Sequence, residues 1–158
     1  MASGPMIALY NEDHTELVST WNAGTVKADE PSEVLTVNIW NNKGGTSDVS
    51  DLKDCVISVY DDNGSTQVED VARDMWVQIN VESMDGSQEE WTKIGGESSK
   101  YIRANDDSIT DFTIRGVKNN GTVSATSNYC TARFQIVAPI NSNPGTKVFK
   151  IRLTGYYT

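Results

Sequence analysis

The sequence predicts an all-β protein, an antiparallel β-sandwich of the immunoglobulin-like kind, with a jelly roll as the alternative fold. Two observations lead to this prediction. Short segments alternate apolar and polar residues with a period of two, as strands with one buried face do. Clusters of Asn, Asp and Gly separate these segments, and such residues tolerate the positive φ angles of tight turns.

The clearest expected strand covers residues 33–40. Leu35, Val37 and Ile39 share one face of this strand, and Trp40 lies on the opposite face. Half-polar strands of this kind are typical of antiparallel sheets in which one face is wetted by solvent. We therefore expect an apolar core on one side of the strand and a solvent-facing surface on the other.

The remaining elements are predicted by the same pattern along the chain. Alternation predicts strands at residues 55–60, 75–81, 112–117, 129–138 and 147–156, and weaker patterns predict strands at 7–10, 25–28, 91–94 and 100–103. A short turn of helix is expected at 48–53, capped by Ser47 or Asp48, whereas residues 68–75 are acidic and ambiguous. Many short strands with turns between them favour a sandwich or a barrel-like fold.

A chain of 158 residues is long enough for one domain and hardly long enough for two. Residues 1–6 are expected to form a flexible N-terminal arm, and residues 7–158 a single sandwich domain. Cys55 and Cys130 are far apart and both point toward the expected core, as the cysteine pair of an immunoglobulin domain does. The match is imperfect, because Trp76 and Tyr129 are displaced from the usual positions. The two cysteines are expected to be small buried thiols, with a disulfide as the alternative.

The charge of the chain disfavours two classes of partner. The formal net charge is −9 and the isoelectric point is about 4.5. Nucleic-acid binding requires a cationic face, and adhesion to anionic lipid requires clustered basic residues. No apolar run approaches the roughly 20 residues of a membrane-spanning helix. We therefore expect neither a nucleic acid nor a membrane as a partner.

The sequence offers no constellation of residues for catalysis. The one histidine, His14, lies among acidic residues and is expected to be a solvated loop residue. One histidine and two cysteines supply neither a catalytic triad nor a structural zinc site. The carboxylates cluster at turns, where turn geometry explains them. We therefore predict that the chain is not an enzyme, and we assign no catalytic, cofactor-binding or metal-binding residue.

Calcium is the one cofactor that the sequence leaves open. Calcium ions bind about six to eight oxygen atoms, often supplied by acidic loops. Two turns are rich in such atoms, one containing Asp48, Asp51 and Asp54 and the other containing Asp61, Asp62 and Asn63. Neither run has the spacing of an EF-hand, so hydrated turns are expected and bound calcium is the alternative.

The aromatic residues supply the candidate interaction surface. Four tryptophans are many for a chain of this size, and Trp40 and Trp76 fall opposite the apolar faces of their strands. Tryptophans on a wetted face would favour a protein interface or a platform for sugar rings, whereas loops folded over them would make them core residues. The candidate surface consists of Trp40, Trp76, Trp91, Tyr156 and Tyr157.

One stretch of the chain has a family resemblance. Residues 39–46, with the sequence IWNNKGGT, are followed by DVSD at 48–51 and by Cys55, and the chain closes through Arg152 to YYT at 156–158. This layout resembles small β-rich structural proteins of tailed phages and prophages of Gram-positive bacteria. The resemblance implies an accessory virion component, either a head decoration protein or a tail or baseplate module, assembled in the host cytoplasm.

The resemblance also implies the partners. A decoration or tail subunit binds other virion proteins such as a major capsid or tail protein, and a homo-oligomer is compatible with that role. We therefore expect a non-catalytic structural protein of a phage particle. The alternative is a carbohydrate-binding or host-attachment module, which the tryptophans and acidic loops would favour and which would recognise surface glycans.

Overall fold

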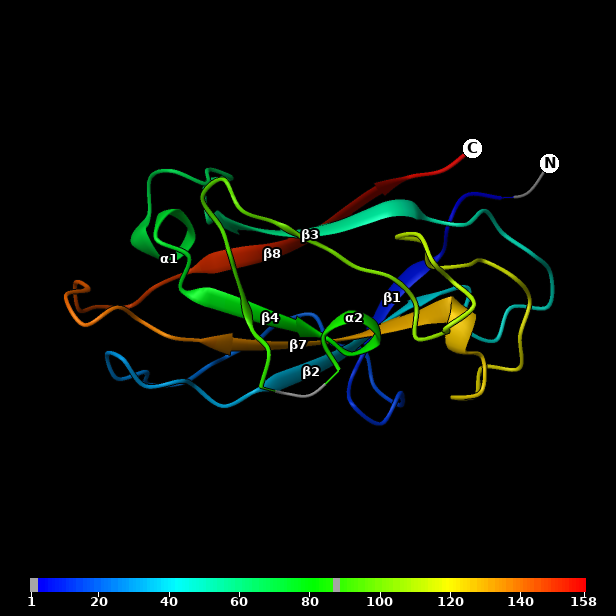
Figure 1. Cartoon of the computed structure of the whole chain (residues 1–158), viewed down its shortest axis with the longest axis horizontal. Helices are drawn as coiled ribbons and strands as arrows, with labels where there is room; N and C mark the ends of the chain where they lie inside the picture. Colours follow the sequence, from blue (N-terminus) through cyan, green and yellow to red (C-terminus); the bar gives the residue numbers. More distant parts are fainter. Residues whose placement is uncertain (1–2, 87–88) are drawn as a thin grey trace.

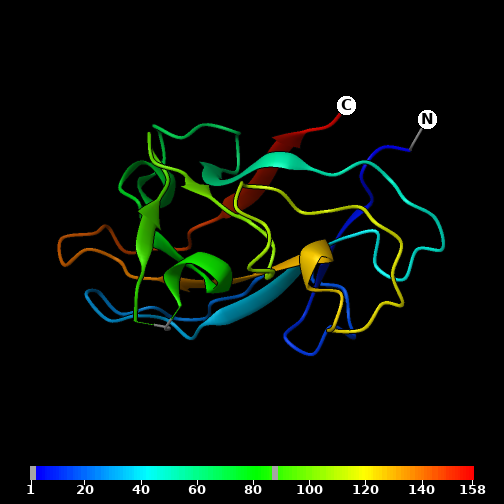
Figure 2. The same ribbon diagram turned by 45° about the vertical axis from the view of Figure 1, so that its right-hand side comes forward.

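The computed structural model describes residues 3–86 and 89–158, and it contains two antiparallel β-sheets stacked on each other (Figures 1 and 2). The larger sheet has the strand order β1-β2-β7-β4-β5, with β1 at Ile7–Tyr10, β2 at Leu35–Asn41, β7 at Tyr129–Ile136, β4 at Val77–Val81 and β5 at Thr92–Ile94. The smaller sheet has the order β6-β3-β8, with β6 at Lys100–Tyr101, β3 at Lys53–Asp61 and β8 at Phe149–Tyr156. The all-β prediction is confirmed.

Short helices complete the described part of the chain. They are α1 at Asp70–Arg73, α2 at Glu82–Asp85 and a 3-10 turn, η1, at Thr126–Asn128. The ambiguous segment 68–75 therefore contains α1, whereas α2 and η1 were not predicted. The helix expected at 48–53 does not form, because Val49 and Leu52 make β-bridges to Ser3 and Ile114 instead.

The core lies between the two sheets. Along β3, Cys55, Ile57 and Val59 are buried while their sequence neighbours are not, as a strand with one inward face requires. In the larger sheet, β2 and β7 pair in register from Leu35 opposite Phe134 to Trp40 opposite Tyr129. Burial of these inward side chains is the main favourable contribution to the stability of the fold.

Two of the expected strands are not strands in the structure. Residues 25–28 have no strand assignment, and residues 112–117 contribute only a bridge between Ile114 and Leu52. Residues 112–117 form no strand because side-chain amides, and not a neighbouring strand, donate hydrogen bonds to the backbone carbonyls of this segment. Asn128 donates to the carbonyls of Arg115 and Val117, and Asn41 donates to that of Ile114.

The expected arm at residues 1–6 lies partly outside the described residues, because residues 1–2 are not described. Its described part is bonded to the rest of the domain. The backbone N–H of Ser50 donates to the carbonyl of Ser3, and that of Met6 donates to Asn41 Oδ1. Gly4 lies against the Tyr157 ring, which places the first described residues beside the C-terminal end (Figure 1).

Each sheet contributes one cysteine to the core. Cys55 on β3 and Cys130 on β7 are both fully buried free thiols. Burial raises the pKa of Cys55 to about 12 and raises the pKa of Cys130 as well, because a thiolate would lose its hydration there.

Candidate functional site

The aromatic residues predicted as one surface are separated by the structure. Trp40 is fully buried and Trp76 is 6% exposed, so both belong to the core and not to a solvent-facing platform. Trp91 is half-buried, whereas Tyr156 and Tyr157 are 50% and 58% exposed near the C-terminus. Of the five predicted residues, these two tyrosines are the ones available to a partner.

Trp40 is buried because a loop covers the face of β2 that the sequence predicted to be wetted. The loop at residues 11–16 lies over this face, and Asn38 Nδ2 donates to the carbonyls of Asn11 and Glu12. The Trp40 indole N–H donates to His14 Nδ1 at 2.9 Å. The polar face of β2 therefore binds the 11–16 loop through hydrogen bonds from Asn38 and Trp40.

His14 is therefore not the solvated residue that was expected. Its ring makes edge contacts with Trp40 and Tyr129, at centroid distances of 5.6 and 4.8 Å. Burial lowers the pKa of His14, and the charge of Lys43 lowers it further, although Asp13 and Glu82 oppose this effect. The neutral form also suits the contact with Trp40, because Nδ1 must keep its lone pair to accept the indole hydrogen.

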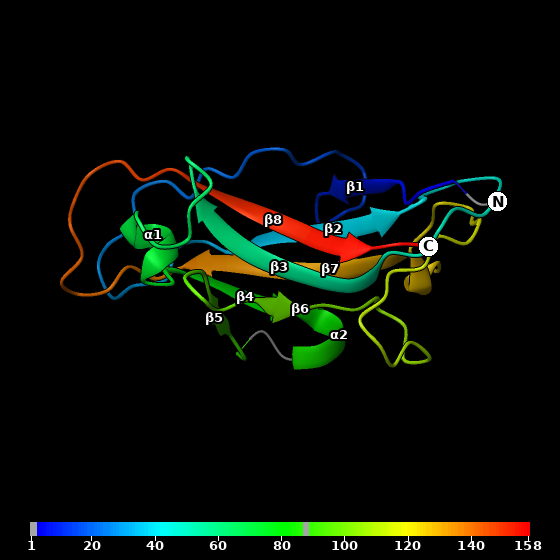
Figure 3. The same cartoon turned by 90° about the horizontal axis from the view of Figure 1, so that it is seen from above.

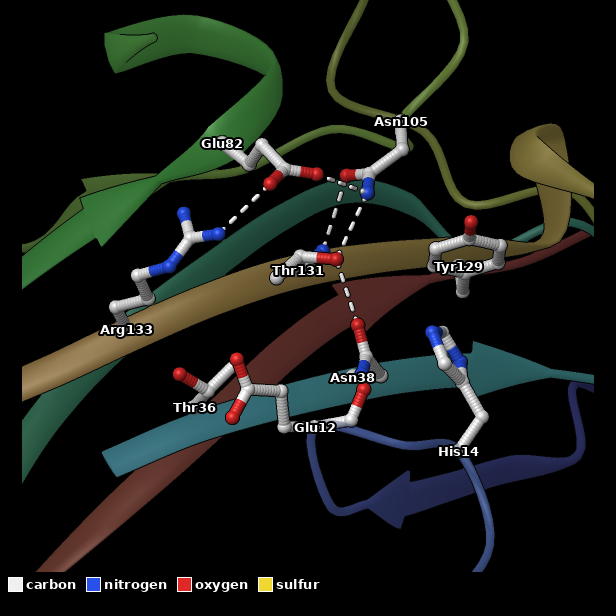
Figure 4. A pocket seen from close by; sticks show the side chains of 9 residues that line it. All are labelled: Glu12, His14, Thr36, Asn38, Glu82, Asn105, Tyr129, Thr131 and Arg133. Carbon is white, nitrogen blue, oxygen red and sulfur yellow. Dashed lines mark hydrogen bonds and ion pairs between the residues drawn. The ribbon is translucent and has the colours of Figure 1, made fainter. Parts of the chain in front are cut away.

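A small polar pocket opens beside this loop (Figure 4). It has a volume of about 220 Å³ and lies between the 11–16 loop, the outer face of β7 and α2. Arg133 and Glu82 form an ion pair of 2.7 Å across it, and Asn105 Nδ2 donates to Glu82 and to Thr131. Its lining residues are Glu12, His14, Thr36, Asn38, Glu82, Asn105, Tyr129, Thr131 and Arg133.

Most of the polar groups of this pocket already have partners within the chain. Thr131 donates to Asn38 Oδ1 at 2.6 Å, and the Tyr129 hydroxyl donates to the carbonyl of Val123. A site with saturated hydrogen bonds can recognise a polar ligand only by exchanging some of them. The pocket suits a small, hydroxyl-rich molecule better than an apolar one.

A much larger groove lies on the other side of β2, between the two sheets. Its volume is about 1200 Å³. Its floor is apolar and comes from the larger sheet, including Val37, Ile39, Phe134 and Ile136. One wall is the segment 18–28 and the other is formed by residues 142–153, which include β8. Trp21 stands in the groove, with its ring centroid 5.8 Å from that of Phe149.

The wall formed by β8 is an open strand edge. Among residues 3–86 and 89–158, β8 pairs with β3 alone, from Phe149 opposite Asp61 to Tyr156 opposite Lys53. The segment that follows β1 passes on the side of β8 away from β3 without forming a strand there (Figure 3). An edge strand presents a row of N–H and C=O groups that can pair with another chain.

The charged residues at the groove all have the same sign. Lys147, Lys150 and Arg152 line it, and no Asp or Glu is among its lining residues. Lys147 is paired with the buried Asp70, at 3.0 Å. Lys150 has only an exposed contact of 4.0 Å with Asp62, and Arg152 lies 4.1 Å above the ring of Tyr60. The latter two cations are open to a partner.

The two acidic turns considered for calcium carry out structural roles. Asp48 and Asp51 accept hydrogen bonds from the backbone N–H groups of Lys118 and Gly116. Asp61 accepts from the N–H groups of Asn63 and Ser65 in its own turn. Across residues 3–86 and 89–158, no three His, Cys, Asp or Glu side chains are grouped so that they could hold a metal ion.

Neither the groove nor the polar pocket was predicted from the sequence. The signal for the groove is the segment 147–153, in which Phe149, Ile151 and Leu153 alternate with the basic residues Lys150 and Arg152. This alternation was interpreted as a strand with one buried face, and it does not tell whether the edge of the strand is paired. The pocket had no signal, because it is assembled from distant segments.

No helix in the described part of the chain has the length and apolar character needed to cross a membrane. Comparisons of the chain with protein-family models, with curated proteins and with solved structures gave no match.

Proposed function

We propose that this chain is a non-catalytic binding protein that attaches to another protein through the groove beside β8, as an accessory structural subunit of a phage particle. The observation that carries the proposal is the groove itself. Apolar side chains at its mouth, such as Trp21, Phe149 and Ile151, are only half-buried, and exposed apolar surface of this kind marks interaction sites because leaving it hydrated costs free energy. Within this proposal the partner is a major capsid or tail protein, and the protein is a component of the virion.

The proposal includes an immunoglobulin-like arrangement of the two sheets, in preference to a jelly roll. Cys55 and Cys130 face the core from opposite sheets, as the inter-sheet cysteines of that fold do. The Tyr129 hydroxyl bonds back to the carbonyl of Val123 at 2.8 Å, which is similar to a tyrosine corner. Both features support the assignment.

The proposal assigns no catalytic residue. His14 is engaged at Nδ1 by Trp40, and the carboxylate of Glu82 is held by Arg133 and Asn105. A general base needs a free lone pair within reach of a substrate proton, and the engaged atoms do not provide one. Binding is the activity that the geometry supports.

The experiment that tests this function is an inventory of purified particles. Phage particles induced from a strain that carries the gene are purified by density gradient, and their proteins are identified by mass spectrometry. We expect this chain to be present in the particles and to remain attached through repeated sedimentation. Particles that are infectious and lack the chain would overturn the proposal.

A second candidate function is recognition of a glycan in the polar pocket. The observation that favours it is the pocket lining. It combines side-chain amides, the Arg133–Glu82 ion pair and the aromatic rings of His14 and Tyr129. A glycan array probed with the labelled protein, with and without calcium, tests this function. Binding that is lost in Arg133→Ala and kept in Lys150→Ala would support it, and an array without signal would overturn it.

A further inference from the structure

We infer that the groove receives an extended, acidic segment of a partner protein, which pairs with the free edge of β8 as an added strand. The inference rests on the proposed function, because it names the chemistry of the partner at the same groove. Three features carry it, namely the unpaired main chain of β8, the size of the groove and the sign of its charges.

The backbone of β8 is hydrogen-bonded along one of its two edges. Among the described residues, the only segment whose groups hydrogen-bond to the backbone of residues 149–156 is β3. A strand of 8 residues spans roughly 26 Å, which is enough to align a peptide of similar length. Added strands gain their affinity from main-chain hydrogen bonds and their specificity from alternate side chains that enter pockets.

The groove has the size and lining for those alternate side chains. Its volume of about 1200 Å³ exceeds the range of about 300–1,000 Å³ that is usual for small-molecule sites. Its floor is apolar, and the wall opposite β8 is the segment 18–28, which carries Trp21. A strand added to β8 would turn every second side chain toward the half-buried Trp21, Phe149 and Ile151, because Val37 and Phe134 beneath them are already buried. The lining thus requires apolar residues at alternate positions of the incoming segment.

The charges specify the remaining positions. Of the 22 acidic residues in the chain, all lie at or before Asp111, so residues 112–158 carry six basic residues and no acidic one. The other 111 residues therefore have a formal charge of 7 − 22 = −15, and the net of −9 is the sum of two opposite regions. Lys150 and Arg152 belong to the basic region and lie at the free edge. Carboxylates on the incoming strand would pair with them.

The same charges disfavour a second copy of this chain as the occupant. Two β8 strands joined edge to edge would bring Lys150 and Arg152 of both copies together, and like charges opposite each other destabilise a strand pair. Basic residues at a free edge are also a common means of preventing self-pairing. The inference therefore commits to a strand from a different protein.

A synthetic peptide tests this inference directly. The probe is a labelled ten-residue peptide with alternating Val and Glu, and its counterpart has Lys in place of Glu. We expect the Glu peptide to bind at least about tenfold more tightly than the Lys peptide, and to protect the amides of residues 149–156 from hydrogen exchange. Fluorescence anisotropy gives the dissociation constants.

A pair of charge variants provides the control. In Lys150→Glu/Arg152→Glu the preference should reverse in favour of the Lys peptide. The matched variant Lys93→Glu/Lys118→Glu makes the same charge change at exposed residues that do not line the groove, and it should keep the preference for Glu. Circular dichroism confirms that both variants are folded.

The outcomes separate this inference from the proposed function. If neither peptide binds or protects β8, while purified particles still contain the protein, the strand inference is overturned and the proposed function stands. A dimer in sedimentation analysis whose formation protects the amides of residues 149–156 from hydrogen exchange would identify a second copy as the occupant, and would overturn the inference too. Absence of the protein from particles overturns the proposed function, whatever the peptides show.

Discussion

At the scale of single residues, His14 fixes the loop at 11–16 to the outer face of the larger sheet. It has a positive φ of 61°, which most residues avoid, and its Nδ1 accepts from an indole that is fully buried. The strain is offset by the hydrogen bond, because a buried N–H without a partner is costly. One side chain thus connects a loop, β2 and the end of β7.

Replacing His14 with alanine should lower the free energy of unfolding by about 1–3 kcal/mol, because the Trp40 indole would lose its acceptor. Urea denaturation followed by tryptophan fluorescence measures the change. Asp13→Ala is the matched control, since this neighbour is exposed and should change stability by less than about 0.5 kcal/mol. Equal effects of the two variants would contradict the role given to His14.

The lowered pKa of His14 makes stability depend on pH. In the unfolded chain the imidazole of His14 has a pKa near 6.5. As the pH falls below this value, His14 becomes protonated in the unfolded chain while it stays neutral in the folded protein. The contribution of His14 to stability is therefore complete above that pH and is lost as the pH falls through 6.5 toward the folded pKa. Urea midpoints between about pH 7.5 and 5 should show this decrease.

His14→Gln provides the comparison for the pH measurement, because its amide oxygen can accept from Trp40 and does not titrate. The pKa values of Asp74 and Asp106 are lowered by hydrogen bonds, from Arg73 and Ser108 respectively, so they titrate at more acidic pH. If His14→Gln has the same slope as the unmodified protein over this range, another group is responsible.

At the scale of elements, buried asparagines replace strand pairing at one end of the larger sheet. Asn128 Nδ2 lies within 3.1 Å of the carbonyls of Asn41, Arg115 and Val117. Asn42 Nδ2 donates to the carbonyls of Ser47 and Gly116. These amides satisfy backbone groups that have no neighbouring strand, as buried backbone groups require.

Asn128→Ala should lower the free energy of unfolding by about 1–3 kcal/mol, because the buried carbonyl of Asn41 and the partly buried carbonyls of Arg115 and Val117 would lose a shared donor. Asn120→Ala is the control, since Asn120 is exposed and bonds only within its own turn. Thermal denaturation by circular dichroism gives both values. A loss below about 0.5 kcal/mol for Asn128→Ala would contradict this account.

Most of the long strands could be predicted from the sequence. Alternation located β2, β3, β4, β7 and β8 because each has an inward face, buried in the first four and partly buried in β8, that fixes its period. It misplaced Trp40 because the loop that covers it comes from a distant part of the chain. The strand predicted at 112–117 does not form for the same reason. The carbonyls of this segment accept hydrogen bonds from the side-chain amides of Asn41 and Asn128, which are distant in sequence, and not from a neighbouring strand.

The candidate site was less predictable than the fold. Its residues come from segments that alternation does describe, such as Phe149 and Ile151 on β8. What the pattern does not contain is the order of strands in a sheet, and therefore which strand is left at an edge. The open edge of β8 follows from topology alone.

At the scale of the whole molecule, the two cysteines report on global opening. Cys55 and Cys130 are enclosed between the sheets, and burial raises both pKa values. The thiolate is the reactive form, so the native protein should hardly react with an aromatic disulfide reagent at pH 8. In denaturant both thiols should react within the mixing time of the experiment.

The dependence of that reaction on urea distinguishes local from global opening. We expect the labelling rate to rise with urea in parallel with the unfolding equilibrium, for both thiols together. Cys55→Ala and Cys130→Ala allow each thiol to be followed alone. One thiol that reacts rapidly in the absence of urea would show that its side of the sandwich opens independently.

The contact between Gly4 and Tyr157 has a practical consequence for handling the protein. Both described ends of the chain emerge together, at the opposite end of the long axis from the 139–148 loop beside the groove (Figures 1 and 3). A tag or surface tether joined to either terminus would therefore hold the molecule in nearly the same orientation. Immobilisation through one terminus or the other should leave peptide capture equally efficient, with the groove directed away from the support.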